Sequence, residues 1–575
     1  MAKIIKNIKR NKFRVHSPKF KSSSRKANID ASFLGSFFGD CPHREEIFKR
    51  YPKRKLPQGA MVTRIAPSPT GFMHIGSIYT ALISERFAHQ TNGVYFLRIE
   101  DTDKKREIKD AYKIIIESLD KFNLSPDEGE DINGKEKGNY GPYRQSKRKE
   151  IYKAFIKYLI EIGRAYPCFC TEEELEEMRR EQEKLKVRTG YYGKWAKWRE
   201  ADEEMVKKML VKNKPYVIRF KSLGNNKNKF IHNDLIKGWL ELPENDLDVV
   251  IMKSDGLPTY HFAHVIDDYL MGTTHIFRGD EWLSSVPIHY ELFEALNLER
   301  PNYGHIAPIN KIDESGGKRK LSKRKDPEAN ISFYDKEGYP KIAVIEYLMN
   351  LANSDFEDWR KNNPDKPYTE FKLSLKGLSA SNGPLFDKIK LDDISKEIIS
   401  KIKAEEVYKE VLAWASKYDN DFKRILKKDK KYWLAIFSIE RGGEKPRKDI
   451  SHWSEVKDTF AFFIKEKFVP QDWANFKSVL QSEEIKEIIG QYKKIFDFND
   501  SREKWLEKIK QIAANFNFAP DIKTYKNNKD KYRGHIGEIA QVIRFAITGR
   551  TKTPDLYQIM QILGEEECKK RLIFK

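Results

Sequence analysis

The sequence is poor in cysteine and has no long apolar run. Only Cys41, Cys168, Cys170 and Cys568 occur among 575 residues, too few and too scattered for a disulfide framework. No apolar stretch approaches the roughly 18 residues that a membrane-spanning helix needs. These absences argue against a disulfide-stapled secreted domain and against an integral membrane protein. They favour a soluble protein of a reducing compartment, and we expect a cytoplasmic location.

Acidic residues are scarce at the N-terminus. The first 60 residues carry 16 Lys and Arg against 4 Asp and Glu, so +12 of the total net charge of +22 lies there. Residues 1–35 contain one acid, Asp30, and no sustained periodicity, which predicts a solvated, disordered tail. An organelle transit peptide and a non-specific RNA-binding arm remain alternatives. The following residues 36–60 are aromatic enough to pack as a short lead-in to the first strand.

A strand, a Pro/Gly loop and a helix follow one another near the N-terminus. Val62–Ala66 is apolar and β-prone, residues 67–71 contain two prolines and a glycine, and apolar residues return at helical spacing from Ile75. Asn92-Gly93 ends this helix, and Val94–Glu100 predicts the next strand. The order predicts a βαβ unit, whose turn presents backbone N–H groups at a helix N-terminus, where phosphate is favoured.

Further strands and then helices follow. Asp248–Met252 predicts a buried strand by its apolar run, and Thr274–Arg278 predicts another. Two such halves separated by an insertion suit an α/β doubly wound, Rossmann-like domain with its ligand at the crevice between the halves. From about residue 331 apolar residues recur at helical spacing, which predicts an all-α C-terminal region.

Two short signatures narrow the function. His74-Ile-Gly-Ser77 resembles the HIGH motif of class I aminoacyl-tRNA synthetases, and Lys320-Leu-Ser-Lys-Arg324, about 245 residues later, resembles their KMSKS motif. A basic run alone is typical of a solvated loop, but the ordered pair is specific. Together with Ala66-Pro-Ser-Pro-Thr-Gly71 and Arg98-Ile-Glu-Asp-Thr-Asp103, the signatures resemble bacterial-type glutamyl-tRNA synthetases, whose C-terminal region is also helical.

The resemblance implies an ATP-dependent enzyme of protein synthesis. It would convert glutamate to glutamyl-adenylate and transfer it to the 3′ end of tRNA(Glu). Three alternatives stay open: a non-discriminating synthetase that also charges tRNA(Gln), a relative that glutamylates a tRNA base, and a non-catalytic RNA-binding paralogue. The length of the chain argues against the second, and the intact signatures argue against the third.

The resemblance also implies roles for individual residues. Catalysis would fall to His74, Lys320 and Lys323. ATP, with Mg²⁺ as its counterion, would contact His74, Gly76, Glu281, Trp282, Lys320, Ser322 and Lys323. Glutamate would contact Arg64, Ser68, Glu100, Tyr260, His264 and Arg278. A guanidinium matches a carboxylate bidentately, which suits this substrate. His264 stands where relatives often have Asn, and a packed core histidine is an equal alternative for it.

A possible zinc site is incomplete. Cys168-Phe-Cys170 resembles the first half of a zinc site that some bacterial members complete with a Cys and a His in a Tyr-x-Gly-x-Cys-x-His context. In the matching stretch, Tyr191–Lys197, Trp195 and Lys197 occupy those two positions, and neither can complete a tetrahedral site of sulfur and nitrogen ligands. We therefore expect two reduced cysteines and no structural zinc.

The predicted layout combines these elements. We expect a monomer whose partners are tRNA(Glu), glutamate and ATP, with no membrane association. The predicted parts are a basic tail (1–35), a lead-in (36–60), a first Rossmann catalytic half (61–170), an inserted acceptor-binding domain (171–245), a second catalytic half with the KLSKR loop (246–330), a stem-contact helical domain (331–400) and a helical anticodon-binding domain (401–575).

Overall fold

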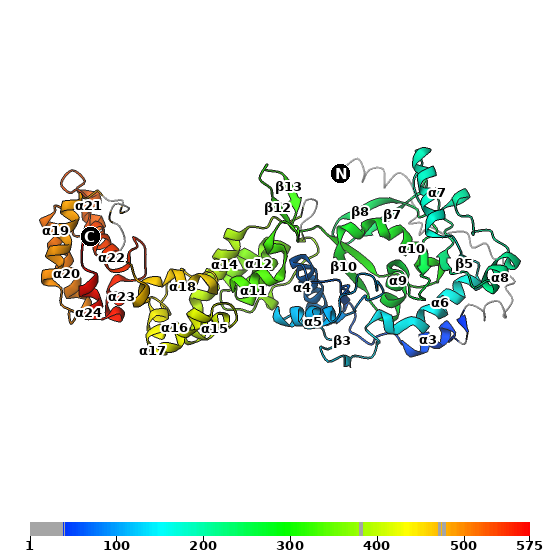
Figure 1. Cartoon of the computed structure of the whole chain (residues 1–575), viewed down its shortest axis with the longest axis horizontal. Coiled ribbons are helices and arrows are strands. Elements are labelled where there is room, and N and C mark those ends of the chain that lie inside the picture. The colour runs from blue at the N-terminus through cyan, green and yellow to red at the C-terminus, as the bar shows by residue number, and fades with distance from the viewer. Residues whose placement is uncertain are drawn as a thin grey trace. The chain divides into compact units, whose positions relative to one another are not determined.

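The computed structural model describes residues 38–39, 41–378, 383–469, 473, 476 and 479–574 (Figure 1). The predicted tail, residues 1–35, lies outside them. The chain forms two compact units. The first contains the described residues up to Ile331 together with Ile345–Asp387, and the second contains Ser332–Val344 and the described residues from Lys388 onward. None of the helices in the described part of the chain combines the length and apolar character that a membrane crossing requires.

The first unit mixes helices with short strands. Its first part contains α3 (Arg44–Arg50), β1 (Val62–Ile65), α4 (Ile75–Gln90), β2 (Val94–Leu97), α5 (Ala111–Lys121), β3 (Gly129–Glu130), β4 (Glu136–Lys137), η1 (Gln145–Arg148), α6 (Lys149–Glu161) and β5 (Ala165–Cys168). Its middle contains α7 (Glu172–Lys184), η2 (Gly193–Trp195), α8 (Glu203–Val211), β6 (Val217–Phe220), β7 (Lys229–Asp234), β8 (Gly238–Pro243) and β9 (Val250–Met252).

The remainder of the first unit returns to alternating strands and helices. It contains α9 (Tyr260–Leu270), β10 (His275–Gly279), η3 (Asp280–Ser285), α10 (Val286–Ala295), β11 (Asn302–Ile306), β12 (Asn310–Ile312), β13 (Lys318–Lys320), η4 (Pro327–Ala329), α13 (Asp355–Asn362) and η5 (Tyr368–Glu370). Two helices, α11 (Ile331–Glu337) and α12 (Lys341–Ala352), contain the points where the chain passes between the units.

The predicted βαβ unit is present. Strands β1 and β2 pair in parallel from Val62↔Val94 onward, and α4 connects them. Strands β10 and β11 also pair in parallel. Thr274 N donates to Val62 O at 3.0 Å, so β10 starts beside β1. Two parallel strand pairs, β1–β2 and β10–β11, therefore lie side by side beneath α4.

The predicted second strand of this unit is too long. The predicted range is Val94–Glu100, but β2 ends at Leu97, because the next donor needed on the β1 side is Pro67, which has no N–H. Arg98 N donates to Ile65 O, whereas Ile99 N donates to Tyr143 O. Glu100 N still donates to Pro67 O at 3.0 Å, so residues 98–100 lie between the β1 segment and the segment of Tyr143, with their side chains buried.

The hairpin of β7 and β8 lies beside the parallel strands. Its two strands pair antiparallel, and Leu235 N, in the hairpin turn, donates to Tyr303 O of β11 at 2.8 Å. Burial alternates strictly along β7, as expected when one face of a strand meets a core. This alternation turns His232 and Asp234 inward, both of them buried. Elsewhere β5, β6 and β9 form an antiparallel sheet.

The segment before β1 packs onto the first unit. Ile47 of α3 is fully buried, and the ring of Phe48 makes edge contacts with Phe155 and Tyr269 at 5.7 and 5.8 Å. Arg54 forms a bidentate pair with Glu128, with both N–O distances at 2.7 Å.

The second unit is all-helical in its described residues, as expected. Its elements are α14 (Lys388–Lys401), α15 (Ala404–Tyr418), α16 (Asn420–Lys428), α17 (Lys430–Ser438), η6 (Trp453–Glu455), α18 (Val456–Thr459), η7 (Ala461–Phe463), η8 (Lys465–Lys467), α19 (Ser482–Ile495), α20 (Arg502–Asn515), α21 (Ile522–Asn527), α22 (Ile536–Thr548), α23 (Leu556–Leu563) and α24 (Glu565–Arg571). One continuous apolar core runs through this unit from Ile399 to Leu572.

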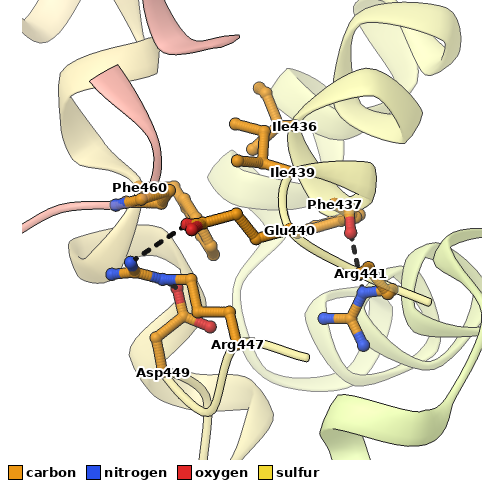
Figure 2. A pocket seen from close by; sticks show the side chains of 9 residues that line it. Ile436, Phe437, Ile439, Glu440, Arg441, Arg447, Asp449 and Phe460 are labelled. Atoms are coloured by element: carbon orange, nitrogen blue, oxygen red, sulfur yellow. Dashed lines mark hydrogen bonds and ion pairs between the residues drawn. The ribbon is translucent and has the colours of Figure 1, made fainter. Parts of the chain in front are cut away.

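A small cavity of about 10 Å³ lies beside the end of α17 (Figure 2). Apolar side chains of α17 and the charged residues Glu440, Arg447 and Asp449 line it. Arg447 Nε donates to Asp449 Oδ2 at 2.7 Å, and Arg447 Nη1 lies 3.5 Å from Glu440 Oε2. The volume is about that of a single water site. The cavity is therefore a packing gap closed by ion pairs and has no room for a ligand.

Gly93 is the residue that lets α4 return into β2, and its replacement tests this packing. A Cβ at Gly93 would lie 1.8 Å from Met61 O, the oxygen that accepts from Val94 N. Because backbone must shift to admit a methyl group, Gly93→Ala is expected to cost about 3 kcal/mol of stability. Differential scanning calorimetry would measure the loss. Gly490→Ala in α19 is the control, since its Cβ would meet nothing within 4 Å. Equal melting temperatures for the two variants would contradict the prediction.

Candidate active site

His74 caps the N-terminus of α4. Its Nδ1 accepts a hydrogen bond from Gly76 N at 2.9 Å, so the proton of the neutral ring lies on Nε2. Burial and then the charge of Lys323 lower the pKa of His74 to about 4, so the ring is neutral at pH 7. Gly76 allows this fold-back, because a Cβ there would lie 3.0 Å from His74 Nδ1. The helix N-terminus thus carries a neutral ring N–H donor, while Gly76 N, Ser77 N and Ile78 N are already bonded to His74.

The two sequence signatures meet at this helix end. Lys323 Nζ donates to Phe72 O at 2.6 Å, and His74 forms an isolated bridge with Asn330. Lys320 Nζ lies 3.6 Å from Glu281 Oε1. Segments about 250 residues apart in sequence therefore place two ammonium groups beside the neutral His74.

The second signature is more ordered than a simple loop. Lys318–Lys320 form strand β13, which pairs with β12, so Lys320 ends a hairpin and only the residues after it are loop. Asp326 fixes that loop, because its carboxylate accepts from Ser322 N at 2.8 Å and pairs with Arg319. The Arg319 guanidinium holds the pKa of Asp326 well below its usual range.

A buried carboxylate lies between two arginines in the centre of the unit. Asp268 Oδ1 is 3.2 Å from Arg64 Nε and accepts from Arg98 Nη1 at 2.8 Å. Arg98 Nη2 donates to Glu100 Oε1 at 2.9 Å. All four side chains are buried. Burial opposes ionisation of Asp268, but the charges of Arg64 and Arg98 hold its pKa well below its usual range. Burial raises the pKa of Glu100, against the charges of Arg98 and Arg64.

Arg278 is held on three sides. Its Nη1 donates to Tyr260 OH at 3.2 Å, its Nη2 donates to Trp282 O at 3.1 Å, and its Nε donates to His305 Nε2 at 3.0 Å. The rings of Tyr260 and Trp282 lie 4.3 Å apart, and Trp282 is 38% exposed. The two aromatic rings thus form a wall that runs from Arg278 to the surface.

Some of the residues predicted to contact glutamate lie together in the interior, but one of them, Ser68, is exposed. Tyr260 contacts Arg278, and burial raises the pKa of Tyr260 against the charge of that guanidinium. Ser68 is exposed in the loop between β1 and α4.

His264, also predicted to contact glutamate, is fully buried. Its Nε2 is 3.0 Å from Tyr303 OH, its Nδ1 is 3.0 Å from Asp268 Oδ2, and its ring stacks on His289 at 4.2 Å. Burial lowers its pKa to about 3. In this structure His264 has the surroundings of a core histidine.

Sequence reasoning missed Asp268, Asp234 and His305. The first had a signal, since Asp267-Asp268 is a pair of acids within the otherwise apolar run of α9. Adjacent buried carboxylates require cationic partners, and the nearby strands supply them. The other two had no local signal, because their partners lie far away in sequence.

The cysteine pair is part of an aromatic cluster. Cys168 Sγ donates to Tyr191 OH at 3.5 Å, and Cys170 Sγ lies 3.6 Å from the same oxygen. Trp198 N also donates to Tyr191 OH, at 3.1 Å. Lys197 is exposed, with its ammonium 3.6 Å from Glu174. Both thiols therefore face a buried phenol oxygen.

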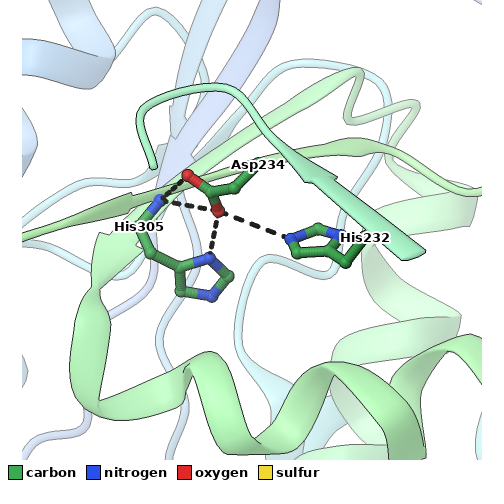
Figure 3. A group of neighbouring side chains, drawn as sticks. All are labelled: His232, Asp234 and His305. Carbon is green, nitrogen blue, oxygen red and sulfur yellow. Dashed lines mark hydrogen bonds and ion pairs between the residues drawn. The ribbon is translucent and has the colours of Figure 1, made fainter. Parts of the chain in front are cut away.

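Within the described ranges, one group of at least three His, Cys, Asp or Glu side chains brings its ligand atoms together: His232, Asp234 and His305 (Figure 3). Asp234 Oδ2 is 2.5 Å from His305 Nδ1 and 3.4 Å from His232 Nε2. Two ligands of one tetrahedral zinc ion stand about 3.3 Å apart, given bonds of about 2.0 Å. Asp234 Oδ1 also accepts from Ile236 N and Lys237 N. The geometry is that of a saturated hydrogen-bonded carboxylate.

Comparisons with known proteins agree with this geometry. A family model described as tRNA synthetases class I (E and Q), catalytic domain, matches residues 60–363, and a model of an anticodon binding domain matches residues 406–573. The glutamate–tRNA ligase of Acetivibrio thermocellus is 50% identical over 522 residues, which cover 91% of this chain and 95% of that protein. The glutamate–tRNA ligase of Clostridium perfringens (strain 13 / Type A) is 48% identical over 92% of this chain and 97% of its own.

A solved structure is also similar. The crystal structure of a glutamate tRNA ligase from Elizabethkingia meningosepticum, in complex with its amino acid, matches with a TM-score of 0.70 at 28% identity, over 89% of this chain and 98% of that one. With two signatures joined at one helix end and near-complete coverage of its relatives, this chain belongs to the glutamate–tRNA ligase family of class I tRNA synthetases.

Proposed function

We propose that this protein is a glutamate–tRNA ligase of the bacterial type, which activates glutamate with ATP and transfers it to tRNA(Glu). The observation that carries the proposal is the bond from Lys323 to Phe72 O, because it joins the two signatures around a neutral His74. A non-catalytic RNA-binding paralogue is not favoured, since decay would be expected in these signatures. Charging of tRNA(Gln) in addition to tRNA(Glu) has no specific observation in its favour.

The phosphate chemistry requires donors and cations at the N-terminus of α4. The glutamate α-carboxylate attacks the α-phosphate of ATP, and negative charge builds on the phosphate oxygens and on the leaving pyrophosphate. His74 would donate its Nε2–H there, and Lys320 and Lys323 would neutralise the triphosphate. Lys323 must exchange Phe72 O for phosphate to do so. Mg²⁺ would enter with ATP, held mainly by phosphate and water.

Other contacts to ATP follow from the family. Gly76 would let the nucleotide approach the backbone, and Ser322 would add a hydroxyl in the second signature. Glu281 and Trp282 would contact the ribose and the base. Exposure of both side chains beside Arg278 is consistent with this role.

Glutamate recognition would use the buried cations. Arg64, Tyr260 and Arg278 would bind the carboxylates, and Ser68 and Glu100 would accept from the ammonium group. Glutamine would present an amide N–H to a guanidinium that only donates, so one hydrogen bond would be lost and one repulsion gained. His264 is also proposed to contact glutamate. Because it is fully buried against Tyr303 and Asp268, it would reach the substrate only after a change in packing.

The finer architecture is part of the proposal. Residues 61–170 and 246–330 would form a Rossmann-like catalytic domain, split by residues 171–245 that hold the acceptor end of tRNA. Residues 331–400 would contact the stem, and residues 401–575 would read the anticodon. The two parallel pairs, β1–β2 and β10–β11, which start beside each other, support the first assignment. We also propose a monomeric, cytoplasmic enzyme, with an organelle location as the alternative if residues 1–35 are a transit peptide.

Glutamate-dependent exchange of pyrophosphate into ATP, measured with tRNA(Glu) present, tests the function. We expect exchange that depends on glutamate and falls to background when glutamine replaces it. Absence of exchange, with transfer RNA bound normally, would contradict an enzymatic role.

We further propose that no structural zinc is bound at Cys168 and Cys170, because Trp195 and Lys197 replace two ligands and Tyr191 OH faces both thiols. Elemental analysis of the purified protein should find zinc well below one equivalent. Stoichiometric zinc that is lost in Cys168→Ala would contradict this.

The role of Lys323 is tested by its removal. The ammonium group is proposed to bind phosphate more strongly in the transition state than in the ground state, because charge grows there as the bond breaks. Lys323→Ala should slow adenylate formation by about 100- to 1000-fold, on the order of 3–4 kcal/mol, by analogy with loss of an oxyanion donor. Single-turnover kinetics with tRNA present would measure the rate, and binding assays would measure glutamate affinity, which should hardly change.

Lys325→Ala is the matched control for this variant, two residues further along the same exposed loop. Its rate should stay near that of the unmodified protein. A loss in Lys323→Ala that lies wholly in ATP affinity would identify an ordinary binding loop instead.

A further inference from the structure

The hydrogen-bonded carboxylate Asp234 reaches the glutamate site through one histidine. Asp234 Oδ2 lies 2.5 Å from His305 Nδ1, and His305 Nε2 accepts from Arg278 Nε at 3.0 Å. All three side chains are buried. The chain of contacts thus runs from β7 through β11 to β10.

The donor and acceptor in each of these hydrogen bonds follow from the guanidinium group of Arg278. A guanidinium has only donors, so His305 Nε2 must offer a lone pair to Arg278. The proton of the neutral ring is then on Nδ1, where it donates to Asp234. A protonated ring would point a second N–H at Arg278 Nε. The contact with Arg278 therefore requires the neutral form and one tautomer of His305.

The surroundings of His305 favour that form. Burial lowers the pKa of His305, and Arg278 and His232 oppose its protonation while Asp234 favours it. Burial alone would raise the pKa of Asp234, but the nearby His232 and the hydrogen bonds from His305 and Lys237 N hold it far below its usual range. Asp234 thus stays ionised and accepts the hydrogen bond from His305 Nδ1.

Asp234 is itself held by backbone. Its Oδ1 accepts from Ile236 N and Lys237 N at 2.9 and 2.8 Å, which forms the turn between β7 and β8. It also lies 3.2 Å from His305 N. The carboxylate therefore cannot rotate without breaking the hairpin turn, which makes it a rigid anchor.

We propose that His305 is a positioning residue that fixes the rotation of Arg278, so that its Nη1 edge faces Tyr260 and the glutamate carboxylate. The inference rests on the proposed role of Arg278 in glutamate binding. The hydrogen bond to His305 restricts rotation of the guanidinium group before substrate binds. Preorganisation of this kind lowers the cost of binding, since less side-chain ordering accompanies it.

Two substitutions separate this role from a purely structural one. The side-chain oxygen of His305→Gln can reach the place of Nε2 and accept from Arg278. The shorter His305→Asn can reach only the place of Nδ1, where its amide can donate to Asp234. The first keeps the contact with Arg278, and the second keeps the contact with the hairpin.

The experiment is steady-state aminoacylation of tRNA(Glu) by the full-length protein, with KM for glutamate, KM for ATP and kcat measured separately. His305→Asn should raise KM for glutamate by about 10- to 100-fold, the usual effect of losing a hydrogen bond to a charged group. His305→Gln should raise it by no more than about threefold on the same reasoning. KM for ATP should change in neither. Circular dichroism melting would verify that both variants fold.

The outcomes are distinguishable. If His305→Asn binds glutamate as well as His305→Gln does, or better, the inference is wrong, because only the bond to Asp234 then matters. If the unmodified protein shows no glutamate-dependent charging, the proposed function fails instead.

A pH profile decides the case if His305→Asn does not fold. Asp234 and His232 from β7 and Arg278 from β10 are the titratable or charged groups that face His305. Protonation of the ring removes the acceptor, and burial lowers the pKa of His305, so KM for glutamate should rise only as pH falls below the ordinary histidine pKa of about 6.5. That rise should be flattened in His305→Gln, which cannot titrate. An equal rise in both proteins would overturn the inference.

Discussion

The carboxylate of Asp268, shared by Arg64 and Arg98 inside the first unit, is the constraint on which the site depends. β1 contributes one arginine, the segment after β2 contributes the other, and α9 contributes the acid. Removing one partner of such a buried pair leaves an uncompensated charge, at a cost of about 3–5 kcal/mol. These bonds therefore hold the first βαβ unit against α9. They also fix the positions of the N-terminus of α4 and of the arginines proposed to bind glutamate.

The sequence was informative where signals are local. The Pro/Gly loop, the helical spacing from Ile75 and the Asn92-Gly93 stop are properties of neighbouring residues, and α4 forms as they predict. The second strand ends three residues before the predicted end, because Pro67 on the paired segment has no N–H to continue the ladder, and the pattern of residues 94–100 does not show which segment pairs with them. The second signature was expected as a loop, but Lys320 ends a strand because β12 lies opposite it.

The candidate site was predictable only in part. Motif resemblance supplied Arg64, His74, Arg278 and Lys323, because families retain such signatures as short strings. It could not supply the residues that orient them. His305 is 27 residues from Arg278 and 71 from Asp234, and only the pairing of β10, β11 and the β7 hairpin brings the three together. Supporting contacts of this kind arise from tertiary structure, so a single sequence does not display them.

Buried guanidinium groups, oriented before substrate arrives, are proposed to recognise glutamate. A crystal structure of the protein with bound glutamate tests this proposal most directly. We predict carboxylate oxygens within hydrogen-bond distance of Arg64 and Arg278, with Arg278 Nε still bonded to His305 Nε2 and Arg98 still bonded to Asp268. Glutamate bound elsewhere, or bound at this site without contact to either Arg64 or Arg278, would contradict the account.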